Sequence, residues 1–416
     1  MKAPKTLIPD IVKTIVKTLE DTGFEAYVVG GAVRDMAMGR EPMDWDVATS
    51  AAPGDVEELF SHFTRFSLRH GITTLVHGGA HYEVSAFRGS VPTIDDDLAH
   101  RDFTINAMAY HPDGGRIIDP YGGRSDIARR MVRAVGAPED RFQEDPLRIL
   151  RAVRISCELD FRIERETRKA MSAMASLLSA VAKERIRDEL LKILISEKPS
   201  RGFQEMARTK LLKEILPELQ NIPGPTLEKM DRVPPDPTLR LAALFHDIGK
   251  PGDKEAHEMK SAKIAEKVLR RLRFSERLIF QVTHLVRHHR DDEQCVSSWD
   301  GGAVRRFVQG LGAEHLESFF FLRRADLEAQ GKDLRALSEL EERARAQVKA
   351  GFPHKVQDLK VDGRKVMEIL GLPEGPEVGR ILEALLEEVL DHPEWNTEEK
   401  LVERLEKMCR DRTRNR

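Results

Sequence analysis

A glycine pair at the end of an apolar segment is the first group of residues that could do chemistry. Gly30 and Gly31 follow Ala26–Val29, a short apolar run that predicts a buried strand. Glycines at a strand end let the backbone approach a ligand closely, and their amides can bind a phosphate. Arg34 lies one helical turn further on and offers a cation for phosphate oxygens. The combination predicts a phosphate site, although an ordinary turn also explains a glycine pair.

Two aspartates and a glutamate form the second chemical group. Asp44 and Asp46 lie two residues apart in a predicted short strand, so their side chains share one face, roughly 7 Å apart along it, while Trp45 and Val47 face the other way. Carboxylate oxygens suit Mg²⁺, usually with substrate phosphates as further ligands. Glu83 lies on a later predicted strand and is either a third acidic ligand or an exposed strand residue. The pair itself is either a metal site or a solvated face.

The segment 142–154 predicts a helix with Pro146 in its first turn, where proline is tolerated, and with an apolar stripe and a polar ridge beside it. Asp145, Arg148 and Arg151 recur every three residues along this ridge. A carboxylate acceptor and guanidinium donors fixed on one helix can read the hydrogen-bonding edge of a base. The same spacing also describes an i,i+3 salt-bridge ladder on a surface helix, and spacing alone favours that alternative.

The composition is that of a soluble globular protein, with 40% hydrophobic and 33% charged residues among 416. No apolar run approaches the roughly 20 residues of a membrane helix, and the amphipathic start differs from a signal peptide. The net charge of −3 argues against a protein that coats nucleic acid everywhere, but it allows a local basic surface. The three cysteines lack metal-ligand spacing. We expect a cytoplasmic protein that does not bind membranes.

The glycines, the arginine and the aspartates together resemble the head of the nucleotidyltransferase superfamily, in particular the class of tRNA nucleotidyltransferases found in bacteria and eukaryotes, and their poly(A) polymerase relatives. The family pattern of a strand, G-G-x-V-R-D and D-x-D is matched by Gly30, Gly31, Val33, Arg34, Asp35, Asp44 and Asp46. Residues 100–107 match its R-R-D-x-T-I-N-A signature, except that His100 stands in place of the first arginine. One phosphate contact that the family makes through this arginine is therefore not implied here. The resemblance implies an α+β protein, with a small polymerase-beta-like α/β head followed by an all-helical neck, HD-like body and tail.

The resemblance also implies an activity and its residues. It implies template-independent addition of nucleotides from CTP, and in some members ATP, to the 3′ end of tRNA by a two-Mg²⁺ mechanism. Asp44, Asp46 and Glu83 would be catalytic, and the two aspartates would hold the metal. The family's E-D-x-x-R helix, which selects CTP or ATP, is matched by Glu144, Asp145 and Arg148. The implied nucleotide-binding residues are Gly30, Gly31, Arg34, Arg101, Asp102, Asn106, Asp145, Arg148, Arg151 and Arg154.

Four parts are expected along the chain: a nucleotidyltransferase head at 1–143, a helical neck at 144–220, an HD-like helical body at 221–348 and a helical tail at 349–416. The proline-rich segment 223–237 predicts a linker near the start of the body. The boundaries follow the motifs and the change from mixed to helical patterning.

The segment Leu241–Pro251, LAALFHDIGKP, resembles the HD superfamily of metal-dependent phosphohydrolases. The residues His246, Asp247, His257 and His288 could bind a divalent ion through nitrogen and oxygen ligands. An HD site normally has a further histidine on the preceding helix, and residues 224–240 contain none. We therefore expect a helical scaffold with weak or absent hydrolase activity.

The connection after Phe87-Arg88 is short, with only Gly89 to Ile94 before Asp95. In the family, enzymes that build the whole CCA end carry a longer flexible loop here, thought to help remodel the pocket from CTP to ATP. A segment this short has little reach. The resemblance is therefore to the CC-adding branch, which stops after two cytidines.

Three other functions remain open from the sequence. A poly(A) polymerase would do the same chemistry on other RNA ends, and the head motifs barely separate the two. An HD-type phosphohydrolase is a different reaction class, weakened by the missing histidine. A non-catalytic RNA-binding protein would leave the acidic pair idle.

Overall fold

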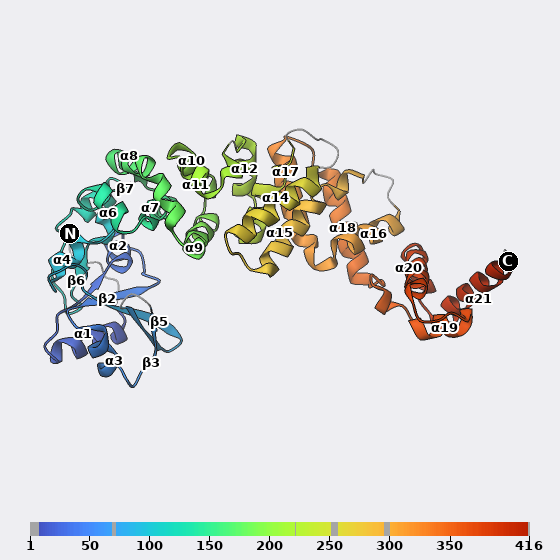
Figure 1. The fold of residues 1–416 in the computed structure, drawn as a ribbon, viewed down its shortest axis with the longest axis horizontal. Helices are drawn as coiled ribbons and strands as arrows, with labels where there is room; N and C mark the ends of the chain where they lie inside the picture. The colour runs from blue at the N-terminus through green and yellow to red at the C-terminus, as the bar shows by residue number, and fades with distance from the viewer. Residues whose placement is uncertain (1–7, 69–71, 221, 251–256, 295–299, 415–416) are drawn as a thin grey trace. The chain divides into compact units, whose positions relative to one another are not determined.

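The computed structural model describes residues 8–68, 72–220, 222–250, 257–294 and 300–414, and Figure 1 traces the chain. The chain folds as two compact units, Met1–Asn221 and Ile222–Arg416. The first carries the mixed α/β structure, and the regular elements described in the second are all helices. Within those residues, no helix is both long and apolar enough to cross a membrane.

A six-stranded sheet organises the start of the first unit, with strand order β3-β4-β5-β2-β1-β6. Its strands are β1 (Ala26–Val29), β2 (Trp45–Thr49), β3 (Thr64–Leu68), β4 (Ile72–His77), β5 (Ala80–Ala86) and β6 (Ala109–Tyr110). The neighbours are antiparallel except β2 and β5, which run parallel. The predicted strands at 26–29 and around Glu83 are confirmed as β1 and β5.

The two faces of this sheet differ, because side chains alternate along each strand. Trp45 and Val47 of β2 face a hydrophobic core that also holds apolar residues of three helices, α1 (Asp10–Asp21), α2 (Gly31–Ala37) and α3 (Pro53–Leu59). Ala48 instead joins a smaller apolar cluster with Leu98 of α4 (Ile94–Ala99). The prediction that Trp45 and Val47 turn away from the aspartates is therefore confirmed.

Short elements and helices complete the first unit. These are η1 (Thr104–Asn106), α5 (Gly123–Ala128), β7 (Met131–Val132), α6 (Pro138–Glu144), α7 (Leu147–Leu159), β8 (Arg162–Ile163), α8 (Arg165–Ala173), η2 (Ala175–Ala180), α9 (Lys183–Leu194), α10 (Pro199–Arg208), α11 (Leu211–Ile215) and η3 (Pro217–Leu219). The helix expected to begin near Pro146 is confirmed as α7, but Asp145, which was expected on its polar ridge, is not part of it. Asp145 lies between α6 and α7 with an extended backbone, because Pro146 disfavours helical geometry in the residue before it.

The second unit consists of helices and short helical turns. They are α12 (Gly224–Arg232), α13 (Pro237–Phe245), α14 (His257–Arg271), α15 (Glu276–His288), η4 (Asp291–Gln294), α16 (Gly301–Leu311), η5 (Ala313–His315), α17 (Leu316–Ala329), α18 (Arg335–Ala350), η6 (Val356–Asp358), α19 (Gly363–Leu370), α20 (Pro376–Asp391), η7 (Pro393–Trp395) and α21 (Glu398–Arg414). The linker predicted at 223–237 is wrong, since most of it is α12. Pro225 falls in the first turn of that helix, where proline is tolerated, and Leu227 and Met230 are buried.

Candidate active site

An acidic face forms where β2 and β5 run side by side. Asp46 of β2 is the register partner of Glu83 on β5, so the two side chains project from the same face of the sheet. Asp44 lies just before the first residue of β2 and is exposed to solvent. The structure therefore brings the three predicted carboxylates to one end of one face, although Asp44 is not part of the strand.

The electrostatics of this face suit a divalent cation. Desolvation raises the pKa of the half-buried Asp46 carboxyl, Arg101 partly offsets this, and the carboxylate of Asp44 adds to it. Desolvation and the charges of Asp46 and Asp44 also raise the pKa of Glu83. Carboxylates that raise each other's pKa hold excess negative charge, and their oxygen-only donor set fits Mg²⁺.

Gly30 sits against this face with a backbone geometry that favours glycine. Its φ is +71°, and a Cβ atom there would lie 3.1 Å from Arg101 Nη1 and 3.3 Å from Asp46 Oδ2. Arg101 is itself fixed by Asp97, whose Oδ2 accepts a 2.7 Å hydrogen bond from Arg101 Nε. The glycine thus lets the backbone pass close to a carboxylate and a guanidinium.

A chain of hydrogen bonds joins four of the predicted nucleotide-binding residues. Arg34 Nη1 donates to Asn106 Oδ1 at 2.9 Å, and Asn106 Nδ2 donates to Asp102 Oδ1 at 3.2 Å. Asp102 Oδ2 then pairs with Arg151 Nη2 at 2.8 Å. The network runs from α2 through η1 to α7, so it links the predicted phosphate residues to the predicted base-reading helix.

Asp102 is the buried centre of that network, with its side chain 8% exposed. Burial alone would raise its pKa, but Arg151 and the Asn106 amide more than offset this and lower the pKa to about 2. The carboxylate is therefore ionised at neutral pH and fixes both neighbours in place.

The residues predicted to read the base already have partners within the first unit. Arg148 donates to Glu144 Oε2 at 2.7 Å and to the His100 carbonyl at 2.9 Å. Asp145 Oδ2 accepts a 2.8 Å bond from Arg185 on α9. Arg148 and Arg151 thus lie beside the segment 100–106, which connects them to the head.

Arg154 is not brought to this group. Its guanidinium pairs with Glu189 of α9 at 2.7 Å and with Glu158 at 2.9 Å. These two carboxylates satisfy most of its hydrogen-bonding capacity, so the structure gives Arg154 a role in fixing α7 to α9.

Comparison with known proteins identifies the group of relatives. Residues 26–133 match the model of the poly A polymerase head domain, and residues 256–405 match that of the putative tRNA nucleotidyltransferase domain 2. Residues 160–222 match a probable RNA and SrmB-binding site of polymerase A. The CCA-adding enzyme of Lactobacillus delbrueckii subsp. bulgaricus is 32% identical over 94% of this chain and 95% of its own. The chain belongs to the tRNA nucleotidyltransferase and poly(A) polymerase family.

Solved structures agree with this assignment. The crystal structure of the Bacillus stearothermophilus CCA-adding enzyme in complex with CTP aligns with a TM-score of 0.79 and 30% identity, over 97% of this chain and 98% of that one. A further relative by sequence, the CCA-adding enzyme of Ligilactobacillus salivarius, is 40% identical over 50% of this chain and 55% of its own. The predicted α+β class and the tRNA nucleotidyltransferase class of enzyme are confirmed.

One residue that positions this family site escaped the sequence analysis. Asp97 is fully buried, binds Arg101, and accepts a 3.1 Å hydrogen bond from the Arg88 amide. It follows Asp95 and Asp96, and residue type alone does not distinguish it from the other two aspartates. The i,i+4 spacing from Asp97 to Arg101 was the available signal.

The His-Asp cluster of the second unit differs from its prediction in one ligand. His246, Asp247 and His257 lie together, but the prediction that His288 joins them is wrong. Its Nδ1 lies 2.6 Å from Asp291, while the next residue, His289, faces Asp247. The histidine missing from the preceding helix is matched by a lysine, Lys229 of α12, which reaches the cluster.

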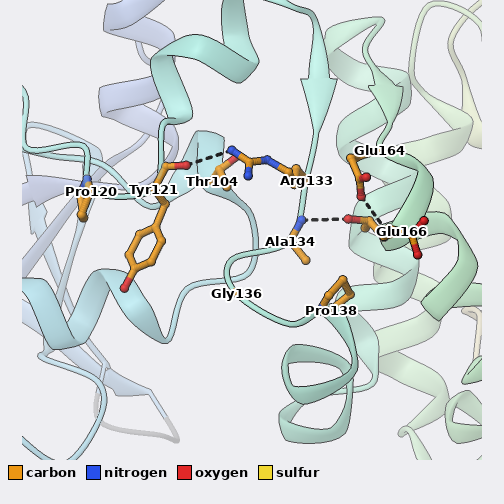
Figure 2. Close-up of a pocket in the computed structure, with 10 residues that line it drawn as sticks. Thr104, Pro120, Tyr121, Arg133, Ala134, Gly136, Pro138, Glu164 and Glu166 are labelled. Carbon is orange, nitrogen blue, oxygen red and sulfur yellow. Dashed lines mark hydrogen bonds between the residues drawn. The ribbon is translucent and has the colours of Figure 1, made fainter.

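A polar pocket of about 450 Å³ lies apart from the acidic face, and Figure 2 shows its lining. Arg133 on its wall donates to Asp126 Oδ2 at 2.8 Å and to the Tyr121 carbonyl at 3.1 Å. The Thr167 hydroxyl oxygen accepts a 3.1 Å hydrogen bond from the Ala134 amide. Because Arg133 is already paired and no predicted site residue lines the pocket, we assign it no role.

Proposed function

We propose that this enzyme adds cytidines from CTP to the 3′ end of tRNA without a template, using Asp44 and Asp46 to hold Mg²⁺. The observation that carries the proposal is the acidic face of Asp46 and Glu83, next to Arg101 and the Arg34–Asn106–Asp102–Arg151 network. The description of the family model matched by residues 256–405, a tRNA nucleotidyltransferase domain, supports tRNA as the substrate, and the solved relative in complex with CTP supports the nucleotide.

In the proposed reaction, the terminal 3′-oxygen of the RNA attacks the α-phosphorus of the nucleotide. A new P–O bond forms, the hydroxyl proton is lost to the surroundings, and pyrophosphate leaves. When bound, two Mg²⁺ ions would favour the ionised 3′-oxygen and neutralise charge on the triphosphate. Gly30 and Gly31 would let the phosphates approach the backbone, and Arg34 and Arg101 would bind their oxygens.

Nucleotide choice would rest on Asp145 and Arg148. We expect Asp145→Ala or Arg148→Ala to relax discrimination against UTP and GTP by about 1–3 kcal/mol, since a bidentate base contact is worth that much. The overall affinity for triphosphate should change less. Competition between CTP and each other nucleotide measures this. Arg165→Ala, whose side chain is 92% exposed on α8, is the matched control. If both variants kept the nucleotide preference of the wild type, the alternative that these residues only form a salt-bridge ladder would be supported instead.

The connection between β5 and α4 supports addition that stops at CC. The Arg88 amide donates to Asp97 Oδ1 at 3.1 Å, and the Val91 amide donates to Asp96 Oδ2 at 2.8 Å. Gly89 has a φ of +91°, and a Cβ there would lie 2.1 Å from Asp96 Oδ2. The segment is thus both short and hydrogen-bonded to α4, so it has little freedom to move and remodel a nucleotide pocket.

A tRNA ending in CC, offered ATP alone, tests this stopping point. We expect adenosine addition at least about a hundredfold slower than cytidine addition to a tRNA that ends before CCA, which corresponds to about 2.7 kcal/mol. Single-turnover gels with labelled nucleotide give both rates. Efficient conversion of CC to CCA would refute the stopping point and leave tRNA nucleotide addition standing.

A further inference from the structure

The His-Asp cluster of the second unit contains two adjoining groups of metal-ligating side chains that share Asp247. One group is His246, Asp247 and Asp326, and the other is Asp247, His257 and His289. Within each group, one ligand atom per residue lies within 4.8 Å of the others. Both groups lie far along the chain from the acidic face, so the inference does not depend on the proposed function.

Lys229 occupies the first group. Its Nζ atom lies 2.5 Å from Asp326 Oδ1, 2.9 Å from His246 Nε2 and 3.3 Å from Asp247 Oδ2. The residue is 4% exposed, and its ammonium is a compact positive charge held by three ligand-type atoms. A metal ion at this position would meet the ammonium, so the lysine takes the place of one cation.

The second group carries buried polar atoms without a partner. Among the described residues, Asp247 Oδ1, His289 Nε2 and both ring nitrogens of His257 have no hydrogen-bond partner. His257 and His289 are 0% and 2% exposed. Leaving a buried polar atom unsatisfied costs about 1–3 kcal/mol, so several in one place point to a ligand that satisfies them together.

The spacing of these atoms suits one ion better than hydrogen bonds. His257 Nε2 and His289 Nε2 lie 3.4 and 3.7 Å from Asp247 Oδ1, which is long for a hydrogen bond. Ligands bound at about 2.1 Å in a tetrahedral shell lie about 3.4 Å from one another. His289 Nδ1 lies 2.7 Å from the Val286 carbonyl, the outer contact that typically orients a metal-binding histidine.

We propose that Asp247, His257 and His289 bind one divalent transition-metal ion, and that Lys229 excludes a second ion beside it. Two imidazoles and one carboxylate favour Zn²⁺ or Ni²⁺ over Mg²⁺, which prefers oxygen ligands. Three protein ligands leave a fourth position open for water or another small ligand. The ion would satisfy Asp247 Oδ1, His257 Nε2 and His289 Nε2, and Lys229 donates to the other oxygen of Asp247.

Zn²⁺ titration of the full-length, chelator-stripped protein tests the site, with excess Mg²⁺ present to occupy the oxygen ligands of the head. We expect one bound Zn²⁺ per chain. His257→Gln and His289→Gln should each weaken binding at least about tenfold. His288→Gln is the matched control. The side chain of His288 contacts Asp291 and not Asp247, so this variant should bind Zn²⁺ as tightly as the wild type. All three variants should retain cytidine addition, and circular dichroism checks their folding.

Lys229→Met tests the second half of the proposal, and its expected result is two bound Zn²⁺ per chain. A single equivalent in the folded Lys229→Met protein would overturn the exclusion by lysine. A folded wild-type protein that binds no Zn²⁺, or an equal loss of affinity in His288→Gln and His289→Gln, would overturn the site itself.

Discussion

Replacing Asp46 by alanine lowers the rate of cytidine addition by about a thousandfold or more while the protein stays folded. The factor corresponds to losing about 4 kcal/mol of transition-state stabilisation, the scale expected when a metal-binding carboxylate is removed. The free energy of unfolding of Asp46→Ala should equal or exceed that of the wild type. Desolvation and Asp44 raise the pKa of Asp46, so its ionised carboxylate destabilises the folded state. Incorporation of labelled CTP into tRNA measures the rate, and tRNA binding should be nearly unchanged.

Two further variants separate charge from shape in this experiment. Asp46→Asn keeps the size of the side chain but removes its charge, so it should be nearly as inactive as the alanine variant. Asp21→Ala removes an exposed aspartate at the end of α1 and should leave the rate unchanged. Near-normal turnover in either Asp46 variant, or in Asp44→Ala, would contradict the assignment of the acidic face.

Replacing Arg151 by alanine destabilises the first unit by about 3 kcal/mol at pH 7, because it leaves the buried Asp102 carboxylate without its 2.8 Å partner. Activity should fall as well, since the network from Arg34 to α7 is interrupted at Asp102. Urea unfolding measures the loss. The double variant with Asp102→Asn should recover part of the stability, because the unpaired charge is then absent. Equal stability of the single and double variants would contradict this account.

The pH dependence of stability follows from the same pair. In the wild type the pKa of Asp102 is lowered to about 2, so its contribution of about 2 kcal/mol is present above the unfolded value near 4 and is lost as the pH falls toward 2. Removing Arg151 takes away the largest influence that lowers the pKa of Asp102, so this pKa should be higher in Arg151→Ala than in the wild type. The stability difference between wild type and Arg151→Ala should therefore be largest at neutral pH and shrink on acidification.

The head was largely predictable from the sequence because its signals are local. The alternation of Trp45, Asp46 and Val47 along one strand fixes which side faces the core, and the structure confirms it. The partnership of Asp46 with Glu83 depends on which strands pair, and adjacency of β2 and β5 is not a local property. The role of Asp97 depends likewise on how α4 docks.

The helical parts were predicted less well, for reasons that particular residues show. Proline at 146 separates Asp145 from the helix that follows, although the spacing of polar residues continues across it. His289 rather than His288 faces the cluster because it continues the buried stripe of Val282 and Val286 on α15. This stripe was visible in the sequence. The insertion of Lys229 was not, since it joins α12 to residues on other helices.

The most direct test of the central claim is incubation of the purified protein with Mg²⁺, a tRNA that lacks its 3′ CCA and each labelled nucleotide separately. We expect CTP to be incorporated up to two residues per tRNA, with little incorporation of ATP, UTP or GTP and none in Asp46→Ala. Processive ATP incorporation onto unrelated RNA ends, or no incorporation of CTP by the folded protein, would contradict tRNA cytidine addition.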